Sequence, residues 1–459
     1  MSQLKVDLAL VQKYNVPGPR YTSYPPATFF TDQVSWPALE DELILNNQTE
    51  RDLSLYFHIP FCYSLCWYCG CHTVITTQQS QSTLYLDYLK KELGRMAKVL
   101  NPKRKVVQMH LGGGSPTFMT PDEIRSLGEL IHSHFTVAAG AEAGVEIDPR
   151  RLTPEHVTAL REAGFNRASV GIQDFDPQVQ KAVHRIQPRE MTEEVIQWIR
   201  AGGFQSLNID LIYGLPYQTV ASFDRTLDQV LELAPDRFAV FSYAHVPWVK
   251  PAQKILETTS ALPSAEVKLQ LLKLITEKLT GTGEYVYIGM DHFARTTDEL
   301  VRAQRNKTLQ RNFQGYSTHA EADIYSFGIS AISQTPNAYW QNIKELPAYY
   351  DALDAGKSPA ARGYLLTPDD KLRRVTIMRL MCDLGLDYAY MSRLLEIDFP
   401  KYYARELASL EDLAGDGLIS QTEAGLEVTQ TGRLFIRNIA MRFDARLPQQ
   451  TERRYSRTI

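Results

Sequence analysis

The chain has 459 residues, which is enough for two or three domains or for one large α/β domain with appendages. Its hydrophobic content of 44% and charged content of 22% are ordinary for a globular protein, and its net charge of −4 favours neither nucleic acid nor a membrane as a partner. The N-terminus lacks the basic start and apolar core of a signal peptide, and no apolar run approaches the roughly 20 residues of a membrane span, so we expect a cytoplasmic protein.

Between about residues 51 and 290, short β-rich runs alternate with amphipathic helical stretches. Six strands are expected, followed by a seventh candidate: 53–57, 106–110, 144–147, 168–172, 206–213, 237–243 and 285–288. Thr120 and Thr153, each followed by proline, are typical helix N-caps. Alternating strands and helices favour parallel pairing with right-handed crossovers. The sequence therefore predicts an α/β fold with an incomplete barrel or a strongly curved sheet.

The residues with unusual chemistry lie just past the carboxyl ends of these strands. In chain order they are a group of cysteines, the segment 112–117 (GGGSPT), the segment 146–149 (EIDP), Gln173-Asp174, Asp210 and Tyr243-Ala244-His245. In barrels of parallel strands the active site forms at this face. The glycine run lacks the endings of phosphate-binding and dinucleotide-binding loops, but its glycines would let the backbone approach a ligand closely.

Three cysteines, Cys62, Cys66 and Cys69, form a C-x3-C-x2-C motif directly after the first strand. Three thiolates can hold three irons of a [4Fe–4S] cluster, and the fourth iron is then open to another ligand. A disulfide framework is not expected without a secretory signal. With Cys71 as a fourth ligand, zinc stays open as an alternative, although the step from Cys69 to Cys71 is too short for paired C-x2-C knuckles. Cys382 lies in a predicted helix, where we expect a buried structural thiol.

Beyond residue 290 the pattern changes to polar-aromatic segments without clear periodicity. A mostly helical region is expected from Thr367 to about residue 414, then a small hairpin at 417–419 and 425–428, then a helix from Gly432. Helices followed by a hairpin resemble a winged helix, which could suggest DNA. Arg433, Arg437 and Arg442 alternate with apolar residues, which favours a packed helix with a solvated face, and the acidic net charge argues against nucleic acid.

Several segments resemble known proteins. Residues 56–62 (YFHIPFC), 112–114 (GGG), 171–175 (GIQDF) and 208–216 (NIDLIYGLP) are similar to the oxygen-independent coproporphyrinogen III oxidase group of the radical SAM superfamily, which includes heme chaperone-like and heme-degrading relatives. Residues 18–25 (GPRYTSYP), 290–294 (MDHFA) and 312–316 (NFQGY) resemble the bacterial oxidases in particular. The resemblance extends from Tyr14 to the C-terminus.

The resemblance implies an incomplete (β/α)6-type radical SAM barrel at 51–290, an N-terminal arm or lid at 1–50, a substrate-pocket extension at 291–366 and a mainly helical, winged-helix-like domain at 367–459. It also implies a [4Fe–4S] cluster on Cys62, Cys66 and Cys69 and two molecules of S-adenosylmethionine. The residues matching positions that hold the cluster-bound molecule are Tyr56, Gly112, Glu146 and Ile329. Those matching the second site are Tyr68, Gly113, Gly114, Gln173, Arg185, Asp210 and Ala244.

The implied reaction converts two propionate side chains of coproporphyrinogen III to vinyl groups, by way of a 5′-deoxyadenosyl radical, and gives protoporphyrinogen IX. Arg20 and Arg311 are candidates for pairing with the carboxylates of this substrate, because each lies among aromatic neighbours in an oxidase-like segment. An unidentified electron donor and acceptor are the other expected partners of a monomeric chain that binds neither nucleic acid nor membrane. A heme chaperone-like protein and a heme-modifying radical SAM protein stay open as alternatives.

Overall fold

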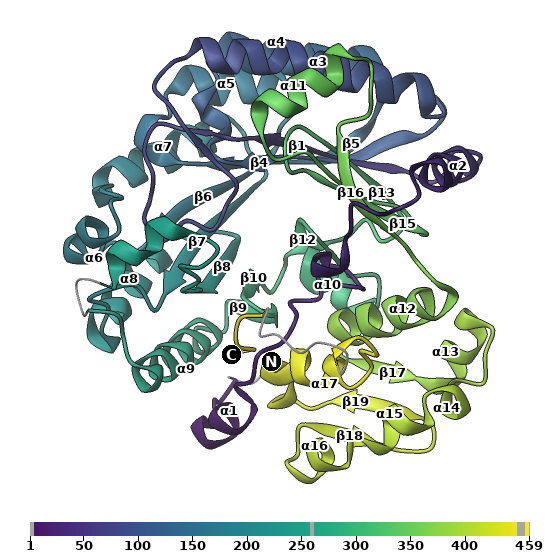
Figure 1. The fold of residues 1–459 in the computed structure, drawn as a ribbon. Coiled ribbons are helices and arrows are strands. Elements are labelled where there is room, and N and C mark those ends of the chain that lie inside the picture. Colours follow the sequence, from purple (N-terminus) through teal and green to yellow (C-terminus); the bar gives the residue numbers. More distant parts are fainter. Residues whose placement is uncertain (1–3, 258–260, 448–454, 459) are drawn as a thin grey trace.

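The computed structural model describes residues 4–257, 261–447 and 455–458 of the chain. Its centre is a strongly curved sheet with the strand order β16-β15-β14-β13-β1-β4-β5-β6-β7-β8-β10-β9 (Figure 1). The strands of this sheet are β1 (Leu53–Ile59), β4 (Lys105–Gly113), β5 (Thr136–Ile147), β6 (Arg167–Gln173), β7 (Ser206–Tyr213), β8 (Arg237–Ser242), β9 (Tyr285–Gly289), β10 (His292–Arg295), β13 (Asp323–Phe327), β14 (Ile332–Gln334), β15 (Ala338–Asn342) and β16 (Ala360–Leu365).

All six predicted strands are confirmed, and they run parallel to one another as β1 and β4 to β8. The seventh candidate, β9, also forms, but it pairs antiparallel with β10, which in turn is antiparallel to β8. The parallel set is extended at the opposite side by β13, which pairs with β1 and lies in a region where no strand was expected. Within the described residues the sheet stays open, with β16 and β9 at its edges.

The strand β7 shows how the two faces of the sheet differ. Leu207, Ile209 and Leu211 are buried on the outer face, and Asn208 and Asp210, which alternate with them, line a cavity on the inner face. Each buried leucine or isoleucine contributes about 1.5–3 kcal/mol. The packing of the outer face therefore holds the polar inner residues in register.

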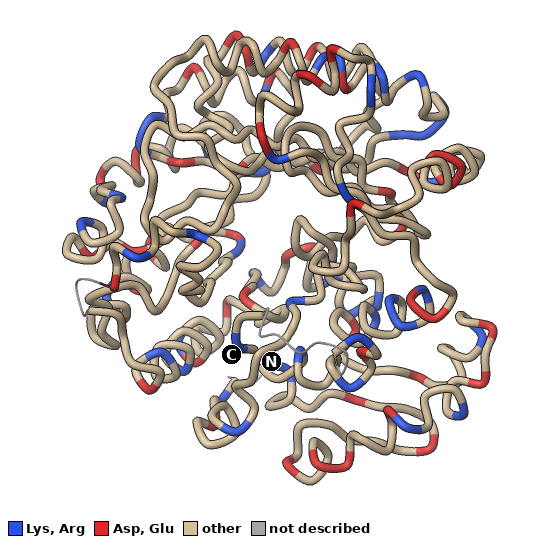
Figure 2. Tube along the Cα trace, in the orientation of Figure 1, with Lys and Arg blue, Asp and Glu red and all other residues tan. Residues whose placement is uncertain are grey.

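Helices cover the outer face of the parallel strands and form the rim of the molecule in Figure 1. They are α3 (Ser80–Val99), α4 (Pro121–His134), α5 (Pro154–Glu162), α6 (Pro177–Ala182), α7 (Arg189–Ala201), α8 (Val220–Glu232) and α9 (Ala265–Gly281). The predicted caps are confirmed: Thr120 begins α4 with a capping box, and Thr153 accepts a hydrogen bond at the start of α5. Figure 2 shows basic and acidic residues interspersed along these helices.

Shorter elements complete the N-terminal and middle parts of the chain. They are α1 (Leu8–Tyr14), α2 (Trp36–Asn46), β2 (Phe61–Cys62), β3 (Val74–Ile75), α10 (Glu299–Arg305), β11 (Gln310–Asn312), β12 (Gly315–Ser317) and α11 (Leu346–Asp354). The described ends of the chain lie close together, since Pro17 pairs with Arg457 in an isolated antiparallel bridge.

The C-terminal region is mainly helical and contains the predicted hairpin before its last helix. Its elements are α12 (Pro368–Asp383), β17 (Gly385–Asp387), α13 (Tyr388–Leu395), α14 (Phe399–Tyr402), α15 (Ala404–Ala408), α16 (Glu411–Gly415), β18 (Ile419–Gln421), β19 (Gly425–Val428) and α17 (Ile436–Met441). The strands β18 and β19 pair antiparallel, and β17 adds a third strand. Cys382 is buried in α12, as predicted.

The expected solvated face of the last helix is wrong for Arg433 and Arg437, whereas Arg442 is partly exposed. Arg433 and Arg437 are buried, and they donate hydrogen bonds to backbone carbonyl oxygens of Tyr287, Gly18 and Pro19 instead of facing water. These acceptors belong to segments far away in the sequence. Among the described helices, none has the length and apolar character that crossing a membrane requires.

Candidate active site

The inner face of the parallel strands lines a cavity of about 450 Å³, and alternate residues of five neighbouring strands point into it. The residues that share this face are Gln108 and His110 of β4, Glu142, Gly144 and Glu146 of β5, Arg167, Ser169, Gly171 and Gln173 of β6, Ser206, Asn208 and Asp210 of β7, and Arg237, Ala239 and Phe241 of β8. The spacing of two along every strand follows from the pleat of a sheet. The strands thus assemble a polar wall from residues that are distant in the sequence.

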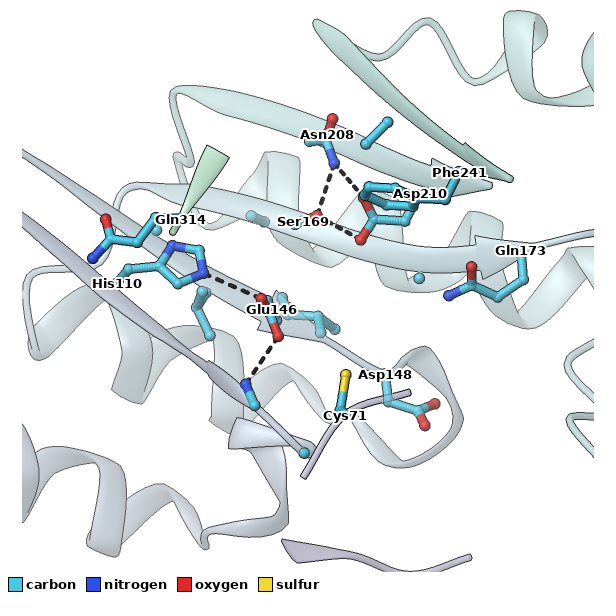
Figure 3. Close-up of a pocket in the computed structure, with 18 of the residues that line it drawn as sticks. Cys71, His110, Glu146, Asp148, Ser169, Gln173, Asn208, Asp210, Phe241 and Gln314 are labelled. Carbon is cyan, nitrogen blue, oxygen red and sulfur yellow. Dashed lines mark hydrogen bonds and ion pairs between the residues drawn. The ribbon is translucent and has the colours of Figure 1, made fainter. Parts of the chain in front are cut away.

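Glu146 lies at the centre of this wall (Figure 3). One carboxylate oxygen accepts a hydrogen bond from the backbone N–H of Gly113 at 3.0 Å, and the other lies 3.3 Å from Nε2 of His110. Burial alone would raise the pKa of Glu146, but these two partners outweigh it and hold the pKa below its ordinary value. The carboxylate is therefore ionised at neutral pH and can accept hydrogen bonds from a cationic ligand.

The glycines after β4 are required by close packing. A Cβ atom on Gly113, whose φ is +110°, would lie 2.5 Å from the ring of His58, and one on Gly112 would lie 2.8 Å from the carboxyl group of Glu146. The His58 ring lies between the side chain of Tyr56 and the backbone carbonyl of His72. Burial lowers the pKa of His58 to about 4, so this imidazole is neutral.

Asp210 is the second carboxylate of the wall. It accepts hydrogen bonds from Ser169 Oγ at 2.9 Å and from Asn208 Nδ2 at 2.8 Å (Figure 3). Burial raises the pKa of Asp210 to about 6, and the nearby negative charge of Glu146 acts in the same direction. The two carboxylates of one cavity thus have pKa values shifted in opposite directions by their surroundings.

The cysteine loop lies at the mouth of the cavity, where Cys62, Cys66, Cys69 and Cys71 are free thiols that line its wall. Within the described residues, no three His, Cys, Asp or Glu side chains converge on a point that could hold one metal ion. A hydrogen bond from Cys71 lowers the pKa of Cys69 to about 6, and burial raises the pKa of Cys62 to about 12.

A group of charged residues borders the loop beside Cys66. Arg150 and Arg185 both donate hydrogen bonds to Asp148, which follows the end of β5, and both reach the sulfur of Cys66. Burial opposes ionisation of Asp148, but the two guanidinium groups hold its pKa far below the usual range.

The structure brings most of the predicted site residues together. The residues that line the cavity are Cys62, Cys66, Tyr68, Cys69, Gly113, Gly114, Glu146, Gln173, Arg185 and Asp210. Tyr56 and Gly112 lie beside this lining on the same face of the sheet: Tyr56 is paired with His110 across β1 and β4 and stacks on its ring, and Gly112 packs against Glu146. Ile329 is fully buried outside the lining.

Ala244 and Arg20 line a second cavity of about 550 Å³, next to α9 and the ends of the chain. There Arg20 forms an ion pair with Asp291. Arg311 lines neither of these two cavities: its side chain is buried, with the guanidinium 4.9 Å from the centre of the Tyr316 ring. Nε of Arg311 donates a hydrogen bond to the backbone carbonyl of Arg20 at 3.4 Å, so the two residues are in contact, although only Arg20 lines the second cavity.

Sequence reasoning missed several residues of the wall. His110, Ser169 and Asn208 contact Glu146 or Asp210 directly, and Arg150 flanks the cysteine loop. A usable signal was present for the first three, because polar residues recur at every second position of strands whose other positions are apolar. Arg150 carries no such periodic signal.

Comparisons with known proteins identify the family to which the chain is similar. Residues 56–230 match the radical SAM superfamily, and residues 366–435 match the HemN C-terminal domain. The oxygen-independent coproporphyrinogen III oxidase of Synechocystis sp. is 45% identical over 455 residues, which cover 98% of this chain and 97% of that protein. The protein of the same name from Escherichia coli is 45% identical over 460 residues, 100% of both chains. The solved structure of coproporphyrinogen III oxidase (HemN) from Escherichia coli, a radical SAM enzyme, matches with a TM-score of 0.92 at 43% identity, covering 97% of this chain and 100% of that chain.

Proposed function

Because the chain belongs to the oxygen-independent coproporphyrinogen III oxidase family of radical SAM enzymes, we propose that its cysteine loop and polar wall hold the cofactors of that reaction. The chain is an oxidoreductase of heme biosynthesis that decarboxylates two propionate side chains of coproporphyrinogen III to vinyl groups and gives protoporphyrinogen IX. A [4Fe–4S] cluster and S-adenosylmethionine supply, when bound, the 5′-deoxyadenosyl radical that removes a hydrogen atom from the propionate.

Cys62, Cys66 and Cys69 are the proposed cluster ligands. Their donor set fits, because three free thiols line one cavity and thiolates are the usual protein ligands of such clusters. Cys71 does not belong to the C-x3-C-x2-C motif, and its hydrogen bond to Cys69 favours the thiolate form of that ligand.

Glu146 is the proposed acceptor for the amino group of the cluster-bound S-adenosylmethionine. This role is supported by its ionised carboxylate, which the N–H of Gly113 and the His110 ring hold in one orientation. Tyr56 supports the site from the neighbouring strand β1 through its stacked contact with His110. Ile329 belongs to the turn after β13, and we propose that it shapes the site through the backbone of that turn.

The remaining wall would hold the second S-adenosylmethionine. Asp210 is oriented by Ser169 and Asn208 and can accept hydrogen bonds from ribose hydroxyl groups. Tyr68, Gly114, Gln173 and Arg185 lie on the same cavity, and Ala244 follows β8 toward the second cavity.

Substrate carboxylates require cations, and we propose Arg20 and Arg311 for this role. Arg20 is half-exposed beside Asp291 at the second cavity, so it can exchange one carboxylate partner for another. Arg311 would have to act from its buried position against Tyr316. We also propose a monomeric, cytoplasmic enzyme that uses a separate electron donor and acceptor and binds neither nucleic acid nor membrane; its five free thiols favour a reducing compartment.

The observation that supports this assignment best is the oriented Glu146 carboxylate beside the cysteine loop. The test is an anaerobic assay of iron- and sulfide-reconstituted protein with coproporphyrinogen III, S-adenosylmethionine, a low-potential reductant and an electron acceptor. Protoporphyrin is expected from the wild-type protein and not from Cys62→Ser. Glu146→Gln should keep the iron content and lose affinity for S-adenosylmethionine. Unchanged affinity in Glu146→Gln would contradict the proposed role of this carboxylate.

A further inference from the structure

Cys66 differs from the other cysteines of the motif in its surroundings. Nη2 of Arg150 lies 3.5 Å from the Cys66 sulfur, and Nη1 of Arg185 lies 3.6 Å from it. Of the three motif cysteines, Cys66 alone accepts hydrogen bonds from guanidinium groups within the described part of the chain. Its exposure is 8%, so these contacts are shielded from bulk water.

Asp148 orients both arginines toward this sulfur. Its carboxylate accepts hydrogen bonds from Nη2 of Arg150 at 2.6 Å and from Nη1 of Arg185 at 3.2 Å. The backbone N–H of Arg150 also donates to Asp148 at 3.1 Å, which fixes the turn Pro149–Arg151 after β5. Figure 3 shows Asp148 beyond the strand end, on the side of the cysteine loop. Two guanidinium groups and one carboxylate leave one net positive charge beside Cys66.

We propose that Arg150, held in place by Asp148, sets the reduction potential of the cluster through its hydrogen bond to Cys66. One-electron reduction adds a negative charge to the cluster and its thiolates, so a nearby cation and a hydrogen-bond donor stabilise the reduced form more than the oxidised form. Hydrogen bonds to sulfur and local charge are recognised determinants of cluster potentials. Arg150 therefore makes the cluster easier to reduce for the electron donor.

The inference rests on the proposed assignment of Cys66 as a cluster ligand, but it concerns a different property. Arg185 is also a candidate contact of the second S-adenosylmethionine, so its replacement would alter two functions at once. Arg150 has no such second role, and its remaining side-chain contact is with Ser64 Oγ at 3.3 Å. The guanidinium group of Arg150 contacts Asp148, Ser64 and Cys66 through different nitrogen atoms. The ammonium group of a lysine has one nitrogen atom and would not reproduce this arrangement.

The test is EPR-monitored redox titration of the reconstituted full-length protein without S-adenosylmethionine or substrate. Arg150→Met removes the charge and the donors at similar length. Arg151→Met is the matched control, because Arg151 lies in the same turn, is exposed, and stacks its guanidinium 4.2 Å from the Tyr63 ring centre. We expect Arg150→Met to reduce the equilibrium constant for cluster reduction about tenfold, a shift of about 59 mV to more negative potential for a one-electron couple. The Arg151→Met protein should stay close to the wild type.

Equal potentials in Arg150→Met and wild type, or equal shifts in Arg150→Met and Arg151→Met, would overturn the inference. Arg150→Lys guards against a loss of folding in the methionine variant: it keeps the charge, and we expect a smaller shift in the same direction. Iron and sulfide contents are measured in every sample. If Cys66→Ser retained a normal cluster, the ligand assignment itself would fail, which is a different result from an unchanged potential in a cluster-loaded Arg150 variant.

Discussion

The carboxylate of Glu92, on the outer helix α3, accepts a hydrogen bond at 2.8 Å from the backbone N–H of Gly328, in the turn after β13. The same side chain accepts hydrogen bonds from Asn342 Nδ2 at 2.7 Å and Tyr349 OH at 2.5 Å. Tyr85 continues the connection, because its hydroxyl donates to the carbonyl of His58 at 2.8 Å and accepts from the N–H of Ile329 at 2.9 Å. A buried carboxylate thus couples the helix layer to the turn beside the candidate active site.

Replacement of Glu92 by leucine should destabilise the protein strongly. The substitution leaves the N–H of Gly328, the hydroxyl of Tyr349 and one N–H of the Asn342 amide buried without an acceptor, at a cost of about 1–3 kcal/mol for each unsatisfied group, while Asn342 keeps its hydrogen bond to the carbonyl of Gly328. Glu92→Gln retains an acceptor and should cost much less. Chemical denaturation of the two variants at one pH measures the difference, and equal free energies of unfolding would contradict the proposed network.

The stability of the protein should also depend on pH through Glu92. Burial raises the pKa of Glu92 to about 7 in the folded state, above its ordinary value of 4.5. The folded state therefore binds the proton more tightly than the unfolded state, so this group's contribution to stability falls as pH rises from about 4.5 through 7 and is constant above that. Glu92→Gln lacks this dependence. The difference in free energy of unfolding between Glu92→Gln and wild type should grow by about 3 kcal/mol across this interval. A difference independent of pH would show that Glu92 does not titrate there.

Asp210→Asn is expected to stabilise the ligand-free protein more at pH 7.5 than at pH 4.5. Burial raises the pKa of Asp210 from 3.8 to about 6, so the free-energy cost of ionising this side chain in the folded state begins above pH 3.8 and is complete only above about pH 6. The same variant should lose at least tenfold in affinity for S-adenosylmethionine, because a ribose hydroxyl would lose its ionised acceptor. Thermal melting at both pH values and equilibrium dialysis measure the two effects. A variant less stable than wild type at pH 7.5 would contradict the first expectation.

Gly113→Ala should impair the site through the backbone. The added methyl group would lie 2.5 Å from the His58 ring at a φ of +110°, which a residue with a side chain adopts only with strain of about 1–3 kcal/mol. We expect at least a tenfold loss of 5′-deoxyadenosine formation at unchanged iron content. Gly70→Ala is the control, because a Cβ atom there meets no neighbour within 4 Å although Gly70 also lies in the cysteine loop. Comparable losses in both variants would show that the close approach to His58 is not the cause.

Arg437→Met should release the N-terminal arm. The buried guanidinium donates to the carbonyl oxygens of Gly18 and Pro19, and on its other side to those of Arg457 and Thr458. Limited proteolysis should cut near residue 18 at least ten times faster than in the wild type, and turnover should fall while the iron content is kept. Arg442→Met removes a partly exposed arginine paired with Asp412 and is the control. A cleavage rate equal to that of the control would exclude the anchoring role.

The sequence predicted the six parallel strands because each is a short apolar run between recognisable helix caps. It did not predict β13, since the run Asp323–Phe327 is followed by antiparallel strands and not by a helix, and its partner β1 lies about 270 residues earlier. The cysteines and glycines of the site were identifiable from their spacing. The roles of His110 and Asn208 depend on the register between strands, which propensities do not reveal.

The two buried arginines Arg433 and Arg437 show a second limit of prediction from the sequence. In the sequence, Arg433 and Arg437 look like the polar side of an amphipathic helix. Their actual hydrogen-bond acceptors are backbone carbonyls of Tyr287 and Gly18, which lie in the middle and at the beginning of the chain. Buried cations are common only where partners satisfy them, and such partners cannot be located from the local sequence.

The pairing of β1 with β13 has a consequence for the order of events during synthesis. The strand that leads into the cysteine loop gains its second neighbour only after residue 327 has been made, and Arg437, which binds the arm before it, is made later still. During synthesis the cysteines therefore leave the ribosome long before the residues that complete their surroundings have been made.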